Sequence, residues 1–174
     1  QINTKIDYIE HGEIPVIRTV NVKMMQFSTK DLKFMSREKY ETVIRSQVLP
    51  GDVILTKVGT IGNVCIFPTE YQEAVLSTTG SCRIRVDESI VNKVFFAYNL
   101  MYLKDKLIEI ASMGVQPFLN MNHIKNIDVL DVPFKQQESF AAFVEQADKS
   151  KVAVQKALDE AQLLFDSLMQ KYFG

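Results

Sequence analysis

An unbroken heptad pattern at the carboxyl end constrains this chain more than any other feature. Apolar residues recur there at alternating steps of four and three, and no glycine or proline interrupts them from Gln136 until Gly174. This is coiled-coil spacing, sustained over about five repeats. At 1.5 Å per residue the helix is on the order of 55 Å long. The seam of this helix comprises Phe140, Val144, Ala147, Lys151, Val154, Leu158, Ala161, Phe165, Leu168 and Tyr172.

A helix of this length is longer than an ordinary packed helix, so we expect it to project from the body and to pair with a partner helix. Lys151 occupies a seam position, where a polar residue lowers stability but can fix register and partner choice. The alternative is a long helix that folds back on its own domain.

A β-hairpin is the clearest prediction for the middle of the chain, in the stretch GDVILTKVGTIGNVCIFP at residues 51–68. Residues typical of strands alternate on both sides of a polar tip. Gly59 and Gly62 permit the positive φ angles of tight turns, so we expect both to shape the tip. Lys57, Thr60 and Asn63 carry polar groups there, which either face solvent or contact a partner.

The rest of the body reads as short strands and helices. The mixed charges of residues 36–46 predict a short exposed helix, with Ser36 as its N-cap. An apolar stripe over residues 91–113 predicts the main helix of the body. Strands are expected near residues 15–20, 22–25 and 82–86, with a further short strand ending at Pro133. In residues 82–86, Arg83 and Arg85 share one face, which is either solvated or in contact with a partner.

The fold class is therefore α+β, a mixed α/β domain at residues 1–133 followed by a long coiled-coil-forming helix at residues 134–174. The chain has 174 residues, 47% hydrophobic and 24% charged, enough to bury one sizeable core. It begins with Gln rather than Met, so we expect a processed or cut fragment. No apolar run approaches a membrane span and no signal segment opens the chain, so we expect a cytoplasmic location.

No catalytic motif is present. Glycine-rich phosphate loops and zinc-protease signatures are absent, and neither His11 nor His123 has a nucleophile motif nearby. Cys65 and Cys82 stand alone in strand-like contexts and predict buried thiols rather than a disulfide or a metal site. We expect no cofactor, no metal ion and no enzymatic activity of the chain itself, and we favour a binding or assembly role.

Charge is unevenly distributed along a nearly neutral chain. The net charge is −1, yet from Arg18 to Lys57 there are eight basic and four acidic residues. A local basic face is compatible with nucleic acid, because phosphate contacts supply most of the non-specific affinity for DNA. A solvated charged face explains the surplus equally well.

Several stretches, in this order, resemble the DNA specificity subunits of type I restriction-modification systems, over a target recognition domain and its adjoining conserved helix. They are GEIPVIRTVNV (12–22), GDVILTKVGTIGNVCIFP (51–68), AVLSTTGSCRIRV (74–86), GVQPFLNMNHIKNIDV (114–129) and VPFKQQESFAAFVEQAD leading into LFDSLMQKYFG. Two features depart from the family pattern. The usual tryptophan-bearing lead-in is absent, and of the proline-rich opening of the final helix only Pro133 and Gln137 carry over.

The resemblance implies a non-catalytic DNA reader. Its recognition domain would bind one half of a bipartite site on double-stranded DNA. Its long helices would pair antiparallel as a spacer and dock the methyltransferase subunits. The restriction subunits are further expected partners. Complete family members carry two recognition domains and two helices. The chain is thus either a half-length subunit or the C-terminal half of a longer chain. A half-length subunit would form a homodimer, or pair with a second specificity half, through the seam.

DNA contact would then divide between phosphates and bases. Lysines and arginines of the 18–57 region would meet phosphates, whereas Asn, Gln, Thr and Arg side chains on loops would read base edges in the major groove. The candidates are Arg18, Thr19, Asn21, Lys23, Lys57, Thr60, Asn63, Thr78 and Thr79.

Two other functions remain open from the sequence. The chain could be the DNA-recognition portion of a larger fused restriction or methyltransferase enzyme whose catalytic domains precede Gln1. It could also be a coiled-coil assembly protein without DNA contact, which the low net charge and the strong seam would suit.

Overall fold

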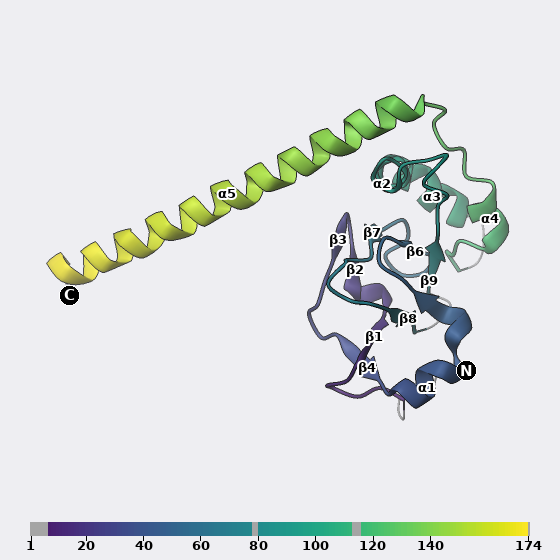
Figure 1. The fold of residues 1–174 in the computed structure, drawn as a ribbon, viewed down its shortest axis with the longest axis horizontal. Coiled ribbons are helices and arrows are strands. Elements are labelled where there is room, and N and C mark those ends of the chain that lie inside the picture. Colours follow the sequence, from purple (N-terminus) through teal and green to yellow (C-terminus); the bar gives the residue numbers. More distant parts are fainter. Residues whose placement is uncertain (1–6, 78–79, 113–115, 174) are drawn as a thin grey trace. The chain divides into compact units, whose positions relative to one another are not determined.

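The computed structural model describes residues 7–77, 80–112 and 116–173, and the chain divides into two compact units. One unit is formed by residues 1–134 and the other by residues 135–174. Figure 1 shows the strands and short helices of the first unit and the single helix of the second. This arrangement confirms the predicted class, a mixed α/β domain followed by a long helix.

Two sheets and a small ribbon form the framework of the first unit. In the four-stranded sheet the order is β4-β1-β8-β5, with β1 parallel to β8 and antiparallel to β4. The second sheet is antiparallel in the order β7-β6-β9, and β2 pairs with β3. The strands are β1 (Ile14–Ile17), β2 (Val22–Lys23), β3 (Gln26–Phe27), β4 (Lys33–Met35), β5 (Gln47–Val48), β6 (Val53–Thr56), β7 (Val64–Ile66), β8 (Ala74–Leu76) and β9 (Ser81–Ile84).

The predicted hairpin is confirmed as β6 and β7, paired in the register Val53 to Ile66 and Leu55 to Val64. All four residues of β6 are buried, because this central strand contributes to two apolar clusters. Val53 and Leu55 join the cluster beneath α2 (Lys93–Tyr102) and α3 (Lys104–Ala111), whereas Ile54 belongs to a second cluster with Phe67. The hairpin therefore joins two parts of the core.

The helices of the body differ from the sequence prediction in two places. The helix expected over residues 91–113 is two helices, α2 and α3, which meet at Leu103. No glycine or proline marks this break. Leu100 before the break and Leu107 after it are both buried in the same cluster, so the two helices contribute to one apolar core. The strand expected before Pro133 is also wrong: within the described chain, residues 127–133 have no regular structure, and Val129 and Leu130 are exposed rather than paired in a sheet.

The other short helices follow local capping rules. Ser36 caps α1 (Arg37–Thr42) by accepting a hydrogen bond from the backbone N–H of Lys39, as predicted. The helix is shorter than expected because it ends at Thr42, before the separate 3-10 turn η2 (Ile44–Ser46). A second 3-10 turn, η1 (Thr19–Asn21), lies earlier in the chain. Asn120 caps α4 (Met121–Lys125) through the N–H of His123.

The second unit consists of the long helix α5 (Phe134–Phe173), which has 40 residues and is thus about 60 Å long. From Lys151 onward every described side chain of this helix is exposed, including Leu158 and Phe165 of the seam. Ion pairs along the helix include Lys149 with Glu145 at 2.6 Å and the seam residue Lys151 with Asp148 at 3.4 Å. None of the helices in the described part of the chain combines the length and apolar character needed to cross a membrane.

Candidate nucleic-acid interface

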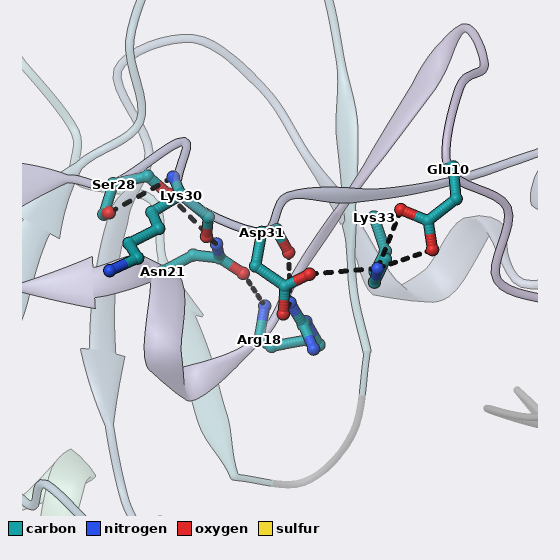
Figure 2. A network of polar contacts seen from close by, with 7 residues as sticks. All are labelled: Glu10, Arg18, Asn21, Ser28, Lys30, Asp31 and Lys33. Carbon is teal, nitrogen blue, oxygen red and sulfur yellow. Dashed lines mark hydrogen bonds and ion pairs between the residues drawn. The ribbon is translucent and has the colours of Figure 1, made fainter.

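A polar network holds the segment that contains the first predicted DNA contacts. Figure 2 shows Arg18 beside Asp31, with their side chains 2.9 Å apart, and Asp31 in turn 2.9 Å from the Lys33 ammonium. Hydrogen bonds from Arg18 and Lys33 hold the pKa of the Asp31 carboxyl down at about 2. Lys33 also binds Glu10 at 2.6 Å. The carboxylates in this network offset much of the positive charge that the sequence places here.

Asn21 has a structural place in the same network. Its side chain is fully buried, and its amide donates to the carbonyls of Ser28 and Lys30 at 3.0 and 3.2 Å. The amide oxygen accepts the Arg18 backbone N–H at 3.1 Å. These bonds fix the chain around the β2–β3 turn, where Met25 has a positive φ of 54°. Asn21 therefore has no free amide group to offer a base.

The side-chain amide of Asn63 at the hairpin tip is likewise engaged in hydrogen bonds within the protein. Its amide nitrogen donates to the Val22 carbonyl at 3.1 Å and its oxygen accepts from the Lys104 ammonium at 3.0 Å. The neighbouring Gly62 has φ +80°, and a Cβ there would lie 2.9 Å from Lys104 Cγ. Gly59 has φ +75°, in open space. Both glycines thus shape the tip, as expected, and the exposed residues there are Val58 and Thr60.

Lys57 lies where three segments of the first unit meet. Its backbone N–H donates to the Gly80 carbonyl at 2.8 Å, and its carbonyl accepts from the Leu119 N–H at 3.0 Å. These bonds join the end of β6, the start of β9 and the segment before α4. The Lys57 backbone, from which its side chain extends, is therefore fixed by main-chain hydrogen bonds on both sides.

The side chain of Lys57 lines a surface hollow of about 290 Å³. Arg45 from η2 and Arg83 from β9 line it as well, so three cationic residues share one small concavity. Ser46, Gln47 and Ser81 add polar groups, and no carboxylate is among the lining residues that the structure describes. We call this feature the cationic hollow.

Within the described residues, no carboxylate pairs with the cations of the hollow, in contrast to those of Arg37 and Arg85. Arg37 is paired with Glu13 and Glu73, and Arg85 binds Asp52 at 2.7 Å. Arg45 and Lys57, by comparison, form no side-chain hydrogen bond or ion pair with any residue that the structure describes. Such a surface attracts anions.

A hydrogen-bond chain fixes Arg83 at the wall of the hollow. Its guanidinium donates to the Gln47 carbonyl. The Gln47 side chain donates to the Tyr40 hydroxyl at 2.6 Å and to the Glu73 carboxylate at 3.3 Å. Burial, together with the hydrogen bond to Glu73, raises the pKa of Tyr40 to about 12, so this phenol stays protonated at neutral pH.

The remaining sequence predictions fall in different places. Lys23 is exposed and Thr19 is half-buried, while Thr78 and Thr79 lie outside the described residues. Arg83 of the hollow was not among the predicted DNA contacts, and Arg45 was included only as one of the basic residues of the 18–57 region expected to meet phosphates. The signal that could have identified Arg83 is its position on a strand, β9, that pairs with strand β6 of the hairpin.

The Cys82 thiol at this site is not suited to nucleophilic catalysis. Cys82 lines the hollow, but burial raises its pKa to about 11, and the positive charge of Lys57 lowers it only in part. The thiol is therefore protonated at neutral pH and a poor nucleophile. Within the described ranges, no group of three His, Cys, Asp or Glu side chains is placed to hold a metal ion.

Comparison with known families decides the identity of the fold. Residues 1–161 match the model of the type I restriction modification DNA specificity domain. The chain belongs to this family. Specificity subunits are the non-catalytic members of type I systems, which agrees with the absence of a catalytic motif in this specificity domain. A comparison with curated proteins gave no match.

Solved structures share the fold of this specificity domain. A chain described under the complex assembly and conformational transition of the type I R-M system is 16% identical, with a TM-score of 0.65 over 98% of the domain. The S subunit from M. genitalium is 19% identical, with a TM-score of 0.57 over 100%. The HsdS subunit from Thermoanaerobacter tengcongensis is 15% identical, with a TM-score of 0.60 over 90%. The domain spans only 40%, 41% and 36% of those three chains.

Proposed function

We propose that this specificity domain binds double-stranded DNA and recognises one half of a bipartite target within a type I restriction-modification complex. The observation that carries the proposal is the cationic hollow, in which Arg45, Lys57 and Arg83 meet without a carboxylate. Phosphate contacts by such residues position a protein on DNA, whereas base contacts supply its sequence preference. The methyltransferase and restriction subunits then act on the DNA that the domain selects.

Exposed polar side chains, rather than the buried amides of Asn21 and Asn63, contact the base edges. Thr60 and Lys23 are exposed, and Thr19 is partly so. Thr78 and Thr79 belong to the segment that runs directly into β9, and the hydroxyl groups of threonines can pair with either partner of a base pair. Asn21 and Asn63 support the fold around these residues through their buried hydrogen bonds.

The long helix α5 suits a pairing role. Its seam residues Val154, Leu158 and Phe165 have exposed fractions of 69%, 60% and 57%, which is unfavourable for apolar side chains in water. The chain spans only 41% and 36% of the two S subunits that share its fold, so we expect its one recognition domain and one helix to combine with a second set. A second copy, or a second specificity half, would supply it by pairing along the seam.

Replacing Lys57 by alanine tests the DNA-binding surface. We expect Lys57→Ala to weaken binding of all duplex sequences alike and to reduce the salt slope of the binding constant by about one unit. Lys106→Ala removes one positive charge from the same unit, at a lysine already paired with Asp128 at 3.3 Å, and serves as the control. Fluorescence anisotropy at several salt concentrations measures both slopes, and equal slopes for wild type and Lys57→Ala would exclude Lys57 from the interface.

The two alternative functions predict different results in the same assay. A coiled-coil assembly protein without DNA contact would give no salt-sensitive binding at low salt. The DNA-recognition portion of a larger fused enzyme would bind DNA in the same way as a specificity subunit, and the full-length gene separates these two. The family match, which covers residues 1–161, favours a DNA-specificity role over assembly alone.

A further inference from the structure

We propose that the cationic hollow is a pocket for one particular phosphate group of the DNA backbone, bound by Arg45, Lys57 and Arg83 and by the hydroxyl of Ser81. The inference rests on the proposed DNA binding and gives it a defined anchor point. It assigns Ser81 a function that neither the heptad pattern nor the hairpin indicates.

Ser81 provides the observation that distinguishes a built site from a general basic surface. This residue lines the hollow, yet it is only 6% exposed, and its hydroxyl has no hydrogen-bond partner among the described residues. Buried hydroxyls in native proteins normally have a partner, because leaving one unsatisfied is costly. A phosphate oxygen in the hollow would accept this hydrogen bond.

Arg83 is held ready for an anion. One guanidinium N–H donates to the Gln47 carbonyl, and Gln47 is itself fixed by Tyr40 and Glu73. An arginine carries five N–H donors in a rigid fork, so this single bond leaves donors for a phosphate. Because the side chain is already ordered, little conformational entropy is lost when it binds.

The walls of the hollow favour a phosphate over an extruded base. An extruded base stacks between aromatic or flat apolar side chains. The lining residues described here include no aromatic side chain, and the apolar ones are Leu76, Cys82 and Met121. Three cations without a carboxylate instead match the charge of a phosphodiester, and arginine pairs with phosphate oxygens in a bidentate geometry.

Ser81→Ala is the most informative variant, because the proposal predicts opposite effects on stability and on binding. Removing an unpartnered buried hydroxyl relieves its desolvation cost, so the melting temperature should stay the same or rise. The affinity for duplex DNA should fall about tenfold, as expected for the loss of a hydrogen bond to a charged group. The matched control is Ser89→Ala, an exposed serine bound to Asp87, which should leave the affinity unchanged.

A phosphate scan locates the contact on the DNA. Uncharged methylphosphonates replace the phosphates of a bound duplex one position at a time, and anisotropy measures the affinity of each. For wild type, one position in the bound half-site should cost about tenfold in affinity. For Ser81→Ala, and for Arg83→Gln checked for folding by circular dichroism, replacement at that position should cost much less.

The outcomes separate this proposal from the proposed function. If wild type binds duplex DNA but its methylphosphonate profile is the same as that of both variants, the phosphate pocket is excluded while DNA binding stands. A Ser81→Ala protein that loses stability and keeps its affinity would also contradict the proposal. If wild type fails to bind any duplex at low salt, both the proposed function and the pocket are wrong.

Discussion

Phe67→Ala should lower the free energy of unfolding of the recognition domain by about 3 to 5 kcal/mol, the usual cost of removing a buried aromatic ring. Phe67 follows β7 and is completely buried. Its ring meets that of Phe27 edge-on at 5.4 Å and stacks on that of Tyr71 at 5.7 Å. Truncation would leave a cavity in the cluster that joins the hairpin to the four-stranded sheet.

The control for Phe67 is another phenylalanine of the same unit. Phe118 is half exposed, so Phe118→Ala should cost no more than about 1 kcal/mol. Urea denaturation followed by circular dichroism, with slopes compared to confirm two-state behaviour, gives both values. Similar losses for the two variants would show that the hairpin does not anchor the core as the structure indicates.

Glutamate at two seam positions should abolish pairing of the long helices. In the Leu158→Glu/Phe165→Glu double variant, each chain loses two apolar contacts and places like charges in the interface. Burying one such side chain is worth roughly 1.5 to 3 kcal/mol, so we expect the dissociation constant to rise at least about a hundredfold. Sedimentation equilibrium measures this constant directly.

The helix supplies its own control for that experiment. Val152 and Leu163 are 70% and 71% exposed, but they lie off the heptad seam. The Val152→Glu/Leu163→Glu double variant therefore adds the same charge to the same helix without entering the interface. If both double variants weaken association equally, or if wild type is a monomer at high concentration, pairing through this seam is excluded.

Periodicity and turn chemistry allowed much of the fold to be predicted from sequence. The helix beyond Phe134, the hairpin at residues 51–68 and the Ser36 cap all depend on local patterns, and each is present. The break at Leu103 was not predictable, because no glycine or proline marks it and the apolar stripe runs across it from Leu100 to Leu107. The apolar residues Val129 and Leu130 likewise predicted a strand, but both are exposed and no strand forms there.

The candidate site was less predictable, because it is assembled by tertiary contacts. Polar residues near turns suggested DNA contacts, but whether an amide faces outward or supports a turn depends on distant carbonyls, such as that of Val22 for Asn63. The cationic hollow brings together residues 45, 57 and 83, which are far apart in sequence. The alternation of residues 82–86 correctly separated Arg83 from buried Cys82, but it could not identify the hydrogen bond to Gln47.

Selection of bound sequences from a library of random duplexes tests the central claim, that this chain is a DNA-specificity domain, most directly. The wild-type protein should enrich one short set of fixed bases, the half-site read by one recognition domain, which occurs twice in a duplex bound by two paired copies. A variant with Arg45, Lys57 and Arg83 all replaced by glutamine should enrich nothing, because it lacks the phosphate contacts that position the domain. Wild-type protein that binds the library with no sequence enriched over the input would contradict the account.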